Sequence, residues 1–97
     1  MIIKFVTLPE SNCQPGKQSW ADVARLLKSK IVAKFSDNVE FRHIEFMSND
    51  WFNDIELIKL SDKLEINFPL VTINNEIFSN GSKINISKIL KDIEYKL

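Results

Sequence analysis

The stretch Phe68-Pro69-Leu70-Val71-Thr72-Ile73-Asn74-Asn75-Glu76-Ile77-Phe78 decides the fold of this 97-residue chain. A proline that opens an apolar run occupies a strand position where the missing N–H costs no ladder bond. The two asparagines tolerate positive φ, and between apolar runs they predict a two-residue hairpin with a primed turn. We therefore expect two antiparallel strands, over 68–73 and 76–78, with Pro69 at the start of the first.

The N-terminal third of the chain predicts one strand and one helix. The run 2–8 is apolar and β-branched except for Lys4, and it stops at Pro9, which is typical of a central strand buried on both faces. From 20 to 35 the apolar residues recur every three or four positions, as in a long amphipathic helix, and Ser19 stands where an N-cap is expected.

The remaining patterns complete an alternating α/β order. Residues 39–46 alternate apolar and polar with one change of phase, which favours a twisted or bulged strand. Helical spacing over 51–64 and again over 86–97 predicts two more helices. The order β-α-β-α-β-β-α, with a right-handed crossover, predicts a single domain over 1–97 in which helices flank both faces of a four-stranded mixed sheet.

Composition excludes several classes of protein. Thirteen basic and thirteen acidic residues cancel, and no window is dominated by Lys or Arg, so we expect no nucleic-acid partner. The short N-terminal apolar run resembles neither a signal peptide nor a membrane span, and one cysteine forms no internal disulfide. We therefore expect a cytoplasmic protein without a membrane partner, and the near-zero net charge favours a homodimer.

The element order, with Cys13 just after the first strand and Pro69 opening the third, resembles the thioredoxin fold. The spacing from the helix ending at Leu64 to Pro69 and the hairpin is similar too, and Gly81 stands where that family has a glycine before its last helix. Within this superfamily the chain looks closest to the small YuzD-like bacterial proteins, which share a Phe- or Tyr-Pro-Leu-hydrophobic-Thr core. The resemblance implies a thiol at the head of the first helix that faces a cis-proline.

The sequence departs from the family where the chemistry lies. Cys13-Gln14-Pro15-Gly16 replaces the Cys-x-x-Cys motif, so Gly16 takes the place of the second sulfur. A single thiol can exchange with a disulfide only with the help of an outside thiol such as glutathione. The resemblance thus implies a monothiol thioredoxin- or glutaredoxin-like protein, a thiol-disulfide oxidoreductase whose partner is a protein thiol or glutathione and which needs no other cofactor.

Its site residues follow from the same resemblance. Cys13 would be the nucleophile, and the backbone and side chains around it would contact the substrate: Gln14, Pro15, Gly16, Phe68, Pro69 and Leu70. If the helix begins at Pro15, its dipole lowers the pKa of Cys13, whereas a helix that begins at Ser19 removes that argument. A lone cysteine is as often inert, and a strand-edge proline is more often trans.

One alternative function stays open, and the remaining candidate residues have structural interpretations. The missing second cysteine favours a non-catalytic interaction domain that keeps the scaffold and binds a protein partner or itself through a sheet edge. The lone His43 reads as a structural strand residue, so no metal site is expected. The tryptophans read as packing residues, and three carboxylates near a helix start read as dipole partners: Asp50, Asp54 and Glu56.

Overall fold

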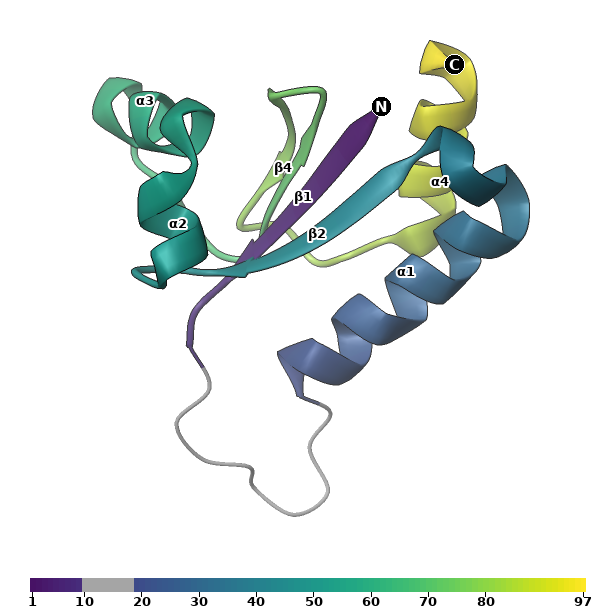
Figure 1. The fold of residues 1–97 in the computed structure, drawn as a ribbon, viewed down its shortest axis with the longest axis horizontal. Helices are drawn as coiled ribbons and strands as arrows, with labels where there is room; N and C mark the ends of the chain where they lie inside the picture. Colours follow the sequence, from purple (N-terminus) through teal and green to yellow (C-terminus); the bar gives the residue numbers. More distant parts are fainter. Residues whose placement is uncertain (10–18) are drawn as a thin grey trace.

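A computed structural model describes residues 1–9 and 19–97 of the chain as one α/β unit (Figure 1). In chain order its elements are β1 (Ile2–Thr7), α1 (Trp20–Phe35), a 3-10 turn (Ser36–Asn38), β2 (Glu40–Glu45), α2 (Asn49–Asn53), α3 (Ile55–Lys63), β3 (Leu70–Ile73), β4 (Glu76–Asn80) and α4 (Ile86–Lys96).

The four strands form one mixed sheet in the order β2-β1-β3-β4. β1 runs parallel to β2 and antiparallel to β3, and β4 is antiparallel to β3, so β3 opposes all the other strands. Helices α1 and α4 cover one face, and α2 and α3 cover the other (Figure 1). The mixed sheet flanked by helices is the architecture that the sequence predicts.

The central strand β1 supplies both hydrophobic cores. Successive side chains of a strand point to opposite faces, so Ile3 and Phe5 pack against α1 and α4 while Val6 packs against α2 and α3. All three side chains have no exposed surface. The predicted central strand is confirmed, and it ends at Thr7.

Local sequence signals fix α1 and the hairpin. The Ser19 hydroxyl accepts a hydrogen bond from the Asp22 N–H at 3.1 Å, so α1 begins at Trp20 as predicted. Asn74 and Asn75 have φ values of 52° and 66°, which are those of a primed turn, and they join β3 to β4. The hairpin prediction is confirmed.

The predicted helix over 51–64 is instead two helices. The Ser48 hydroxyl accepts from the Trp51 N–H at 3.3 Å and starts α2 early. Asp54 then adopts an extended backbone (φ −94°, ψ 96°), and its carboxylate accepts from the Leu57 N–H at 3.1 Å to start α3. The helix breaks at Asp54, whose carboxylate is also held by Lys4 of the central strand β1.

Two strand predictions also need correction. β2 pairs with β1 in unbroken register from Glu40 to Glu45, so it is not bulged. The irregularity lies in the hairpin, where the register shifts between Val71 and Thr72. β4 extends to Asn80, beyond the predicted end at Phe78, because its pairing with β3 continues as far as Leu70, which lies opposite Asn80.

Candidate functional site

Pro69 comes directly before β3, at the end of the sheet where β1 finishes. The Phe68–Pro69 peptide bond is cis, the isomer that the resemblance implies. Val6 pairs with Leu70, so Thr7 and Pro69 come next to the paired residues at the same end of the sheet. The chain that leaves β1 and the proline that precedes the hairpin therefore lie at the same end of the sheet, as the resemblance to the thioredoxin fold implies.

An apolar groove of about 360 Å³ opens beside Pro69. It lies between the first turns of α1 and the segment that leads into α4. Its lining is Trp20, Val23, Leu26, Pro69, Gly81, Ser82, Lys83, Ile84 and Ile86. The groove can take an apolar or aromatic group, and among the described residues that line it only Lys83 is charged.

Gly81 closes one side of this groove. Its N–H donates to the Pro69 carbonyl at 2.9 Å, and its φ is +87°, where glycine is favoured. A Cβ at this position would stand 2.6 Å from the Cβ of Asn67. A glycine is therefore required here both by backbone conformation and by space.

The two neighbours of Pro69 point away from the groove. Phe68 packs against Phe46 on the α2 side, with ring centroids 4.9 Å apart, and Leu70 is fully buried in the same cluster. The expectation that the Leu70 side chain contacts a substrate is not met, because successive residues of a strand face opposite ways. Pro69 alone of the three lines the groove.

Four of the predicted site residues, Cys13, Gln14, Pro15 and Gly16, lie outside the described residues. Residues on either side of this segment are described and show where it begins and ends. Thr7 stands beside the Pro69 end of the sheet, and Trp20 lines the groove. α1 begins at Trp20 with Ser19 as its N-cap, which removes the argument that the dipole of an α1 helix starting at Pro15 activates Cys13.

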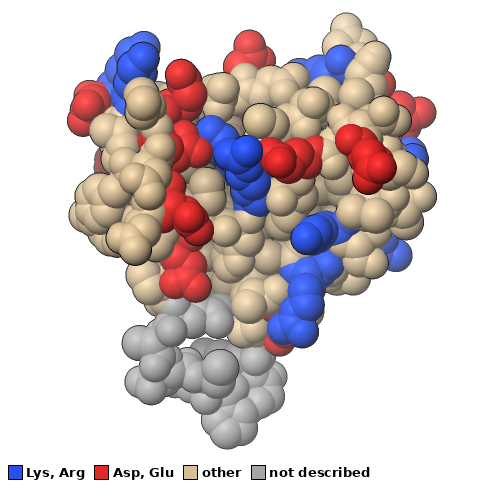
Figure 2. All heavy atoms as spheres, viewed as in Figure 1, with Lys and Arg blue, Asp and Glu red and all other residues tan. Residues whose placement is uncertain are grey.

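A second hollow, of about 560 Å³, lies on the other side of the sheet between β2 and the helices α2 and α3. Its lining is Lys4, Arg42, His43, Ile44, Asp50, Asn53, Asp54, Ile55 and Glu56. We call it the acidic hollow, since its wall on α2 and α3 carries three carboxylates. Figure 2 shows a row of acidic side chains on the side of the molecule where α2 and α3 lie.

Lys4 and Asp54 form a buried ion pair in this hollow. The Lys4 Nζ lies 2.8 Å from Asp54 Oδ2, and it donates to Asp54 Oδ1 at 3.0 Å and to Asn75 Oδ1 at 2.9 Å. The side chains of Lys4 and Asp54 are only 6% and 9% exposed. These contacts bind β1, the hairpin turn and the start of α3 together, so the pair positions the wall of the hollow.

Sequence reasoning missed this pair. It treated Lys4 as an interruption and Asp54 as a dipole partner, although Asp54 does cap α3. One signal was available: a lysine in the middle of a strand predicted to be buried on both faces needs a buried partner. The sequence offered several carboxylates for that role and did not single out Asp54.

His43 lies in β2, within the strand predicted over 39–46. Its Nε2 lies 2.8 Å from the Thr7 hydroxyl, and its ring stacks at a tilt near Phe5, with centroids 5.5 Å apart. Within residues 1–9 and 19–97 no group of three or more His, Cys, Asp or Glu side chains is arranged to hold a metal ion. The described helices include none that is long and apolar enough to cross a membrane.

Comparison with known proteins gives one likeness in fold. No family model and no curated protein matches the chain. The crystal structure of SA0789, a protein of unknown function from Staphylococcus aureus, superposes with a TM-score of 0.69 at 16% sequence identity, covering 98% of this chain and 89% of that one. At this identity the likeness concerns the fold alone, and it extends over nearly the whole domain.

Proposed function

We propose that this chain is a thioredoxin-like protein, related to the YuzD-like group, that performs monothiol exchange through Cys13. The observation that carries the proposal is that the start of α1 and cis-Pro69 border one apolar groove, while β1 ends at the same end of the sheet as Pro69. The strand order, with β3 antiparallel to the other strands, supports the same assignment. Cys13 lies in the segment between these two flanks.

The reaction needs one thiol in the protein and one outside it. The Cys13 thiolate attacks one sulfur of a disulfide, a new S–S bond forms, the old S–S bond breaks, and the second sulfur leaves as a thiolate that takes up a proton. A glutathione thiolate then attacks the substrate-derived sulfur of the mixed disulfide and releases the Cys13 thiolate, which takes up a proton. The other product is a mixed disulfide of glutathione and that substrate group, which is glutathione disulfide when the group is itself glutathione. The chain itself is unchanged over the cycle.

The groove beside Pro69 would hold the non-reacting part of the substrate. Its walls are apolar side chains of α1, of the segment before α4 and of the start of α4, such as Val23 and Ile86. We therefore expect it to favour a substrate that carries an apolar or aromatic group beside its disulfide. Because Trp20 lies in the groove, a mixed disulfide on Cys13 should change the Trp20 fluorescence. Trp51 is buried in the opposite core and serves as a constant background.

Reaction with glutathione disulfide tests the proposal. We expect a glutathione adduct in the mass spectrum of the native protein, none in Cys13→Ser, and a faster reaction of the folded chain than of the same chain in denaturant. The unfolded chain is the matched control, because it reports the intrinsic reactivity of a thiol with a pKa near about 8.5. A folded protein that forms no adduct, or reacts no faster than the unfolded chain, removes the proposal.

The second candidate is a non-catalytic interaction domain. It is favoured by Gly16 in place of the second cysteine and by the loss of the dipole argument, since α1 begins at Trp20. In that case Cys13→Ser leaves partner binding unchanged. Within residues 1–9 and 19–97 the sheet ends on β2 at one side and on β4 at the other, and such binding would use one of these two edge strands.

A further inference from the structure

Two hollows share a wall near the start of α4. One is the apolar groove beside Pro69. The other has a volume of about 250 Å³ and lies between β4 and α4, and we call it the α4 hollow. Its lining is Phe78, Ser79, Ser82, Lys83, Ile84, Asn85, Lys88 and Ile89. Because the segment 82–84 lines both, the groove and the α4 hollow adjoin each other.

The α4 hollow is basic. Its described lining includes the ammonium groups of Lys83 and Lys88 and no carboxylate. Neither ammonium forms an ion pair with a carboxylate of the described residues. The first turn of α4 carries no acidic residue either, so the positive end of the helix dipole adds to the charge of the two lysines.

The carboxylates of the neighbouring elements are engaged elsewhere. On α4, Asp92 Oδ2 lies 3.1 Å from the Nζ of Lys96. On β4, Glu76 Oε2 lies 3.8 Å from the same ammonium. On α1, Asp22 Oδ1 accepts from Arg25 Nη2 at 2.8 Å, and neither side chain lines the groove. An anion in the α4 hollow would therefore meet two ammonium groups and no carboxylate of the described lining.

The Ser79 hydroxyl is an unused hydrogen-bonding group in the wall of the α4 hollow. Its oxygen is buried and has no hydrogen-bond partner among the described residues. A buried hydroxyl without a partner is unfavourable, because it has lost its bonds to water and gained none. An acceptor oxygen inside the hollow would give this hydroxyl a partner.

We propose that the groove and the α4 hollow together bind a small organic acid. Its apolar or aromatic group lies in the groove beside Pro69, and its carboxylate lies in the α4 hollow. Lys83, which lines both hollows, pairs with the carboxylate, and Lys88 and the Ser79 hydroxyl face it from α4 and β4. A mainly apolar lining with a few convergent polar groups is typical of small-molecule sites.

Both parts of this ligand follow from the lining. A bare inorganic anion would leave the apolar wall of the groove in water, including Val23 and Ile86. A purely apolar ligand would leave the charges of Lys83 and Lys88 uncompensated. Only a molecule that carries both groups complements the two adjoining hollows.

Two other hollows suit such a ligand less well. The acidic hollow has three carboxylates in its wall, and Lys4 and Arg42, which also line it, each form an ion pair, at 2.8 and 2.7 Å. On the other side of β2, a hollow of about 300 Å³ is lined by Ala21, Ala24, Arg25, Lys28, Phe41 and His43. Its Arg25 is paired with Asp22, and its two alanines offer little apolar surface.

Binding of two matched probes tests the proposal, and all measurements use Cys13→Ser so that no thiol chemistry contributes. The probes are 4-phenylbutyrate and its neutral amide, 4-phenylbutanamide. Trp20 fluorescence reports the occupation of the groove, because Trp20 lines it. We expect the acid to bind about tenfold more tightly than the amide, since only the acid accepts charge-assisted hydrogen bonds from both lysines. This difference should shrink as salt is raised.

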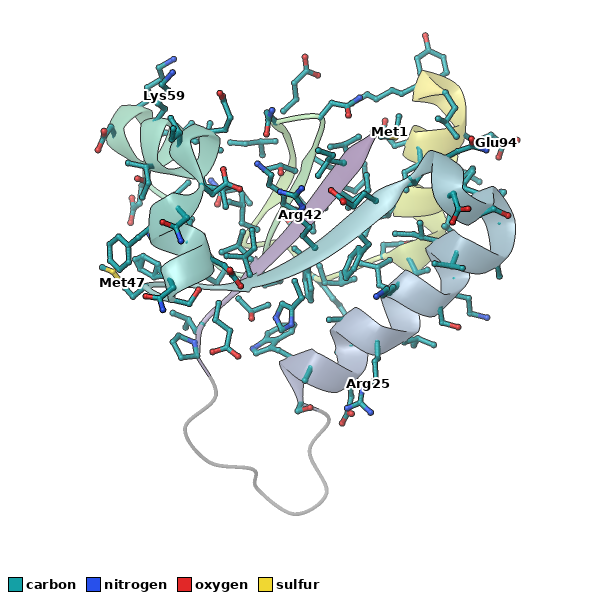
Figure 3. All side chains as sticks on the ribbon, in the orientation of Figure 1. Met1, Arg25, Arg42, Met47, Lys59 and Glu94 are labelled. Carbon is teal, nitrogen blue, oxygen red and sulfur yellow. The ribbon has the colours of Figure 1, made fainter. Side chains whose placement is uncertain are left out.

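Three lysine variants locate the carboxylate. Lys83→Met should remove most of the preference for the acid and leave the binding of the amide nearly unchanged. Lys91→Met is the matched control on the same helix, since Lys91 is exposed and lines neither hollow. Lys59→Met is a distant control, because Figure 3 shows Lys59 on α3, on the opposite side of the molecule from Glu94 of α4. Both controls should bind the two probes as Cys13→Ser does.

Ser79→Ala separates contact with the ligand from a structural role. The substitution removes a buried hydroxyl that has no partner, so the stability in urea should be unchanged or higher. The affinity for 4-phenylbutyrate should nevertheless fall several-fold. An unchanged affinity would contradict the placement of the carboxylate in the α4 hollow.

Other results would also overturn the proposal. Equal affinities for the acid and the amide would do so, as would a preference for the acid that Lys83→Met leaves intact. Displacement of 4-phenylbutyrate by inorganic phosphate but not by the amide would show that the site recognises the anion alone. A protein that binds 4-phenylbutyrate as expected but forms no glutathione adduct supports this inference while it removes the proposed function.

Discussion

The Lys4 ammonium lies 2.8 Å from the Asp54 carboxylate across the junction of β1 and α3, and neither side chain is more than 9% exposed. The chain therefore keeps a charged pair inside the layer formed by the sheet and α2–α3. Such a pair is costly to desolvate, and its value depends on both partners being present. This relationship gives the first two predictions.

Asp54→Asn should lower the free energy of unfolding by about 3–5 kcal/mol, because it removes the carboxylate charge that faces the buried Lys4 ammonium. The amide keeps a side-chain oxygen that can still cap α3, so the loss reports the charge and not the cap. Urea unfolding provides the measurement. Asp62→Asn, at an exposed position of α3, is the matched control, and equal losses for the two variants would contradict the prediction.

Asn75→Gly should also destabilise, although Asn-Gly is the preferred sequence of a primed turn. The change removes the side-chain oxygen that accepts from Lys4 at 2.9 Å, a bond to a charged group worth about 1.5–3 kcal/mol. In a Lys4→Met/Asp54→Asn background the same substitution should be neutral or stabilising. A loss of equal size in both backgrounds would show that the turn geometry, not the ammonium, sets the preference for asparagine.

Gly81→Ala should destabilise the protein and disturb the groove beside Pro69. The positive φ alone costs about 1–3 kcal/mol for a residue with a side chain, and the new Cβ would meet Asn67 at 2.6 Å. Thermal unfolding should show the loss, and Trp20 fluorescence should report the change in the groove. Ser87→Ala, at an exposed position of α4 outside the groove lining, should change neither.

Leu26→Glu should slow the reaction of Cys13 with an aromatic disulfide such as dithiodipyridine several-fold and leave the reaction with hydroxyethyl disulfide nearly unchanged. Leu26 lines the groove and is 43% exposed, so the substitution should not affect folding. Val32→Glu is the control, since Val32 is 49% exposed on the same helix outside the groove. If both variants slow the aromatic disulfide equally, the groove plays no part in substrate binding.

Much of the fold could be predicted because its signals are local. The helix from Trp20 to Phe35 has the bounds that its apolar spacing and its Ser19 cap predict. The hairpin follows from two adjacent asparagines that tolerate positive φ. Both depend on residues that are neighbours in sequence, so the pattern alone was sufficient.

The failures share a different cause. The helix predicted over 51–64 breaks at Asp54 because Lys4, fifty residues earlier, holds the carboxylate that also starts α3. Likewise, local sequence did not show that Phe68 and Leu70 pack in the cluster on the α2 side while Pro69 lines the groove. No local pattern carries this information.

The sequence by itself determined the order of the elements, the central place of β1, the turn at Asn74–Asn75 and the position of Pro69 at the start of the hairpin. Only the tertiary structure decided which carboxylate pairs with Lys4 and which hollows lie on the two sides of β2. The physical reason is how far apart along the chain the interacting residues lie. Hydrophobic periodicity and turn propensity act between chain neighbours, whereas charge pairing and groove formation require segments that only the folded sheet brings together.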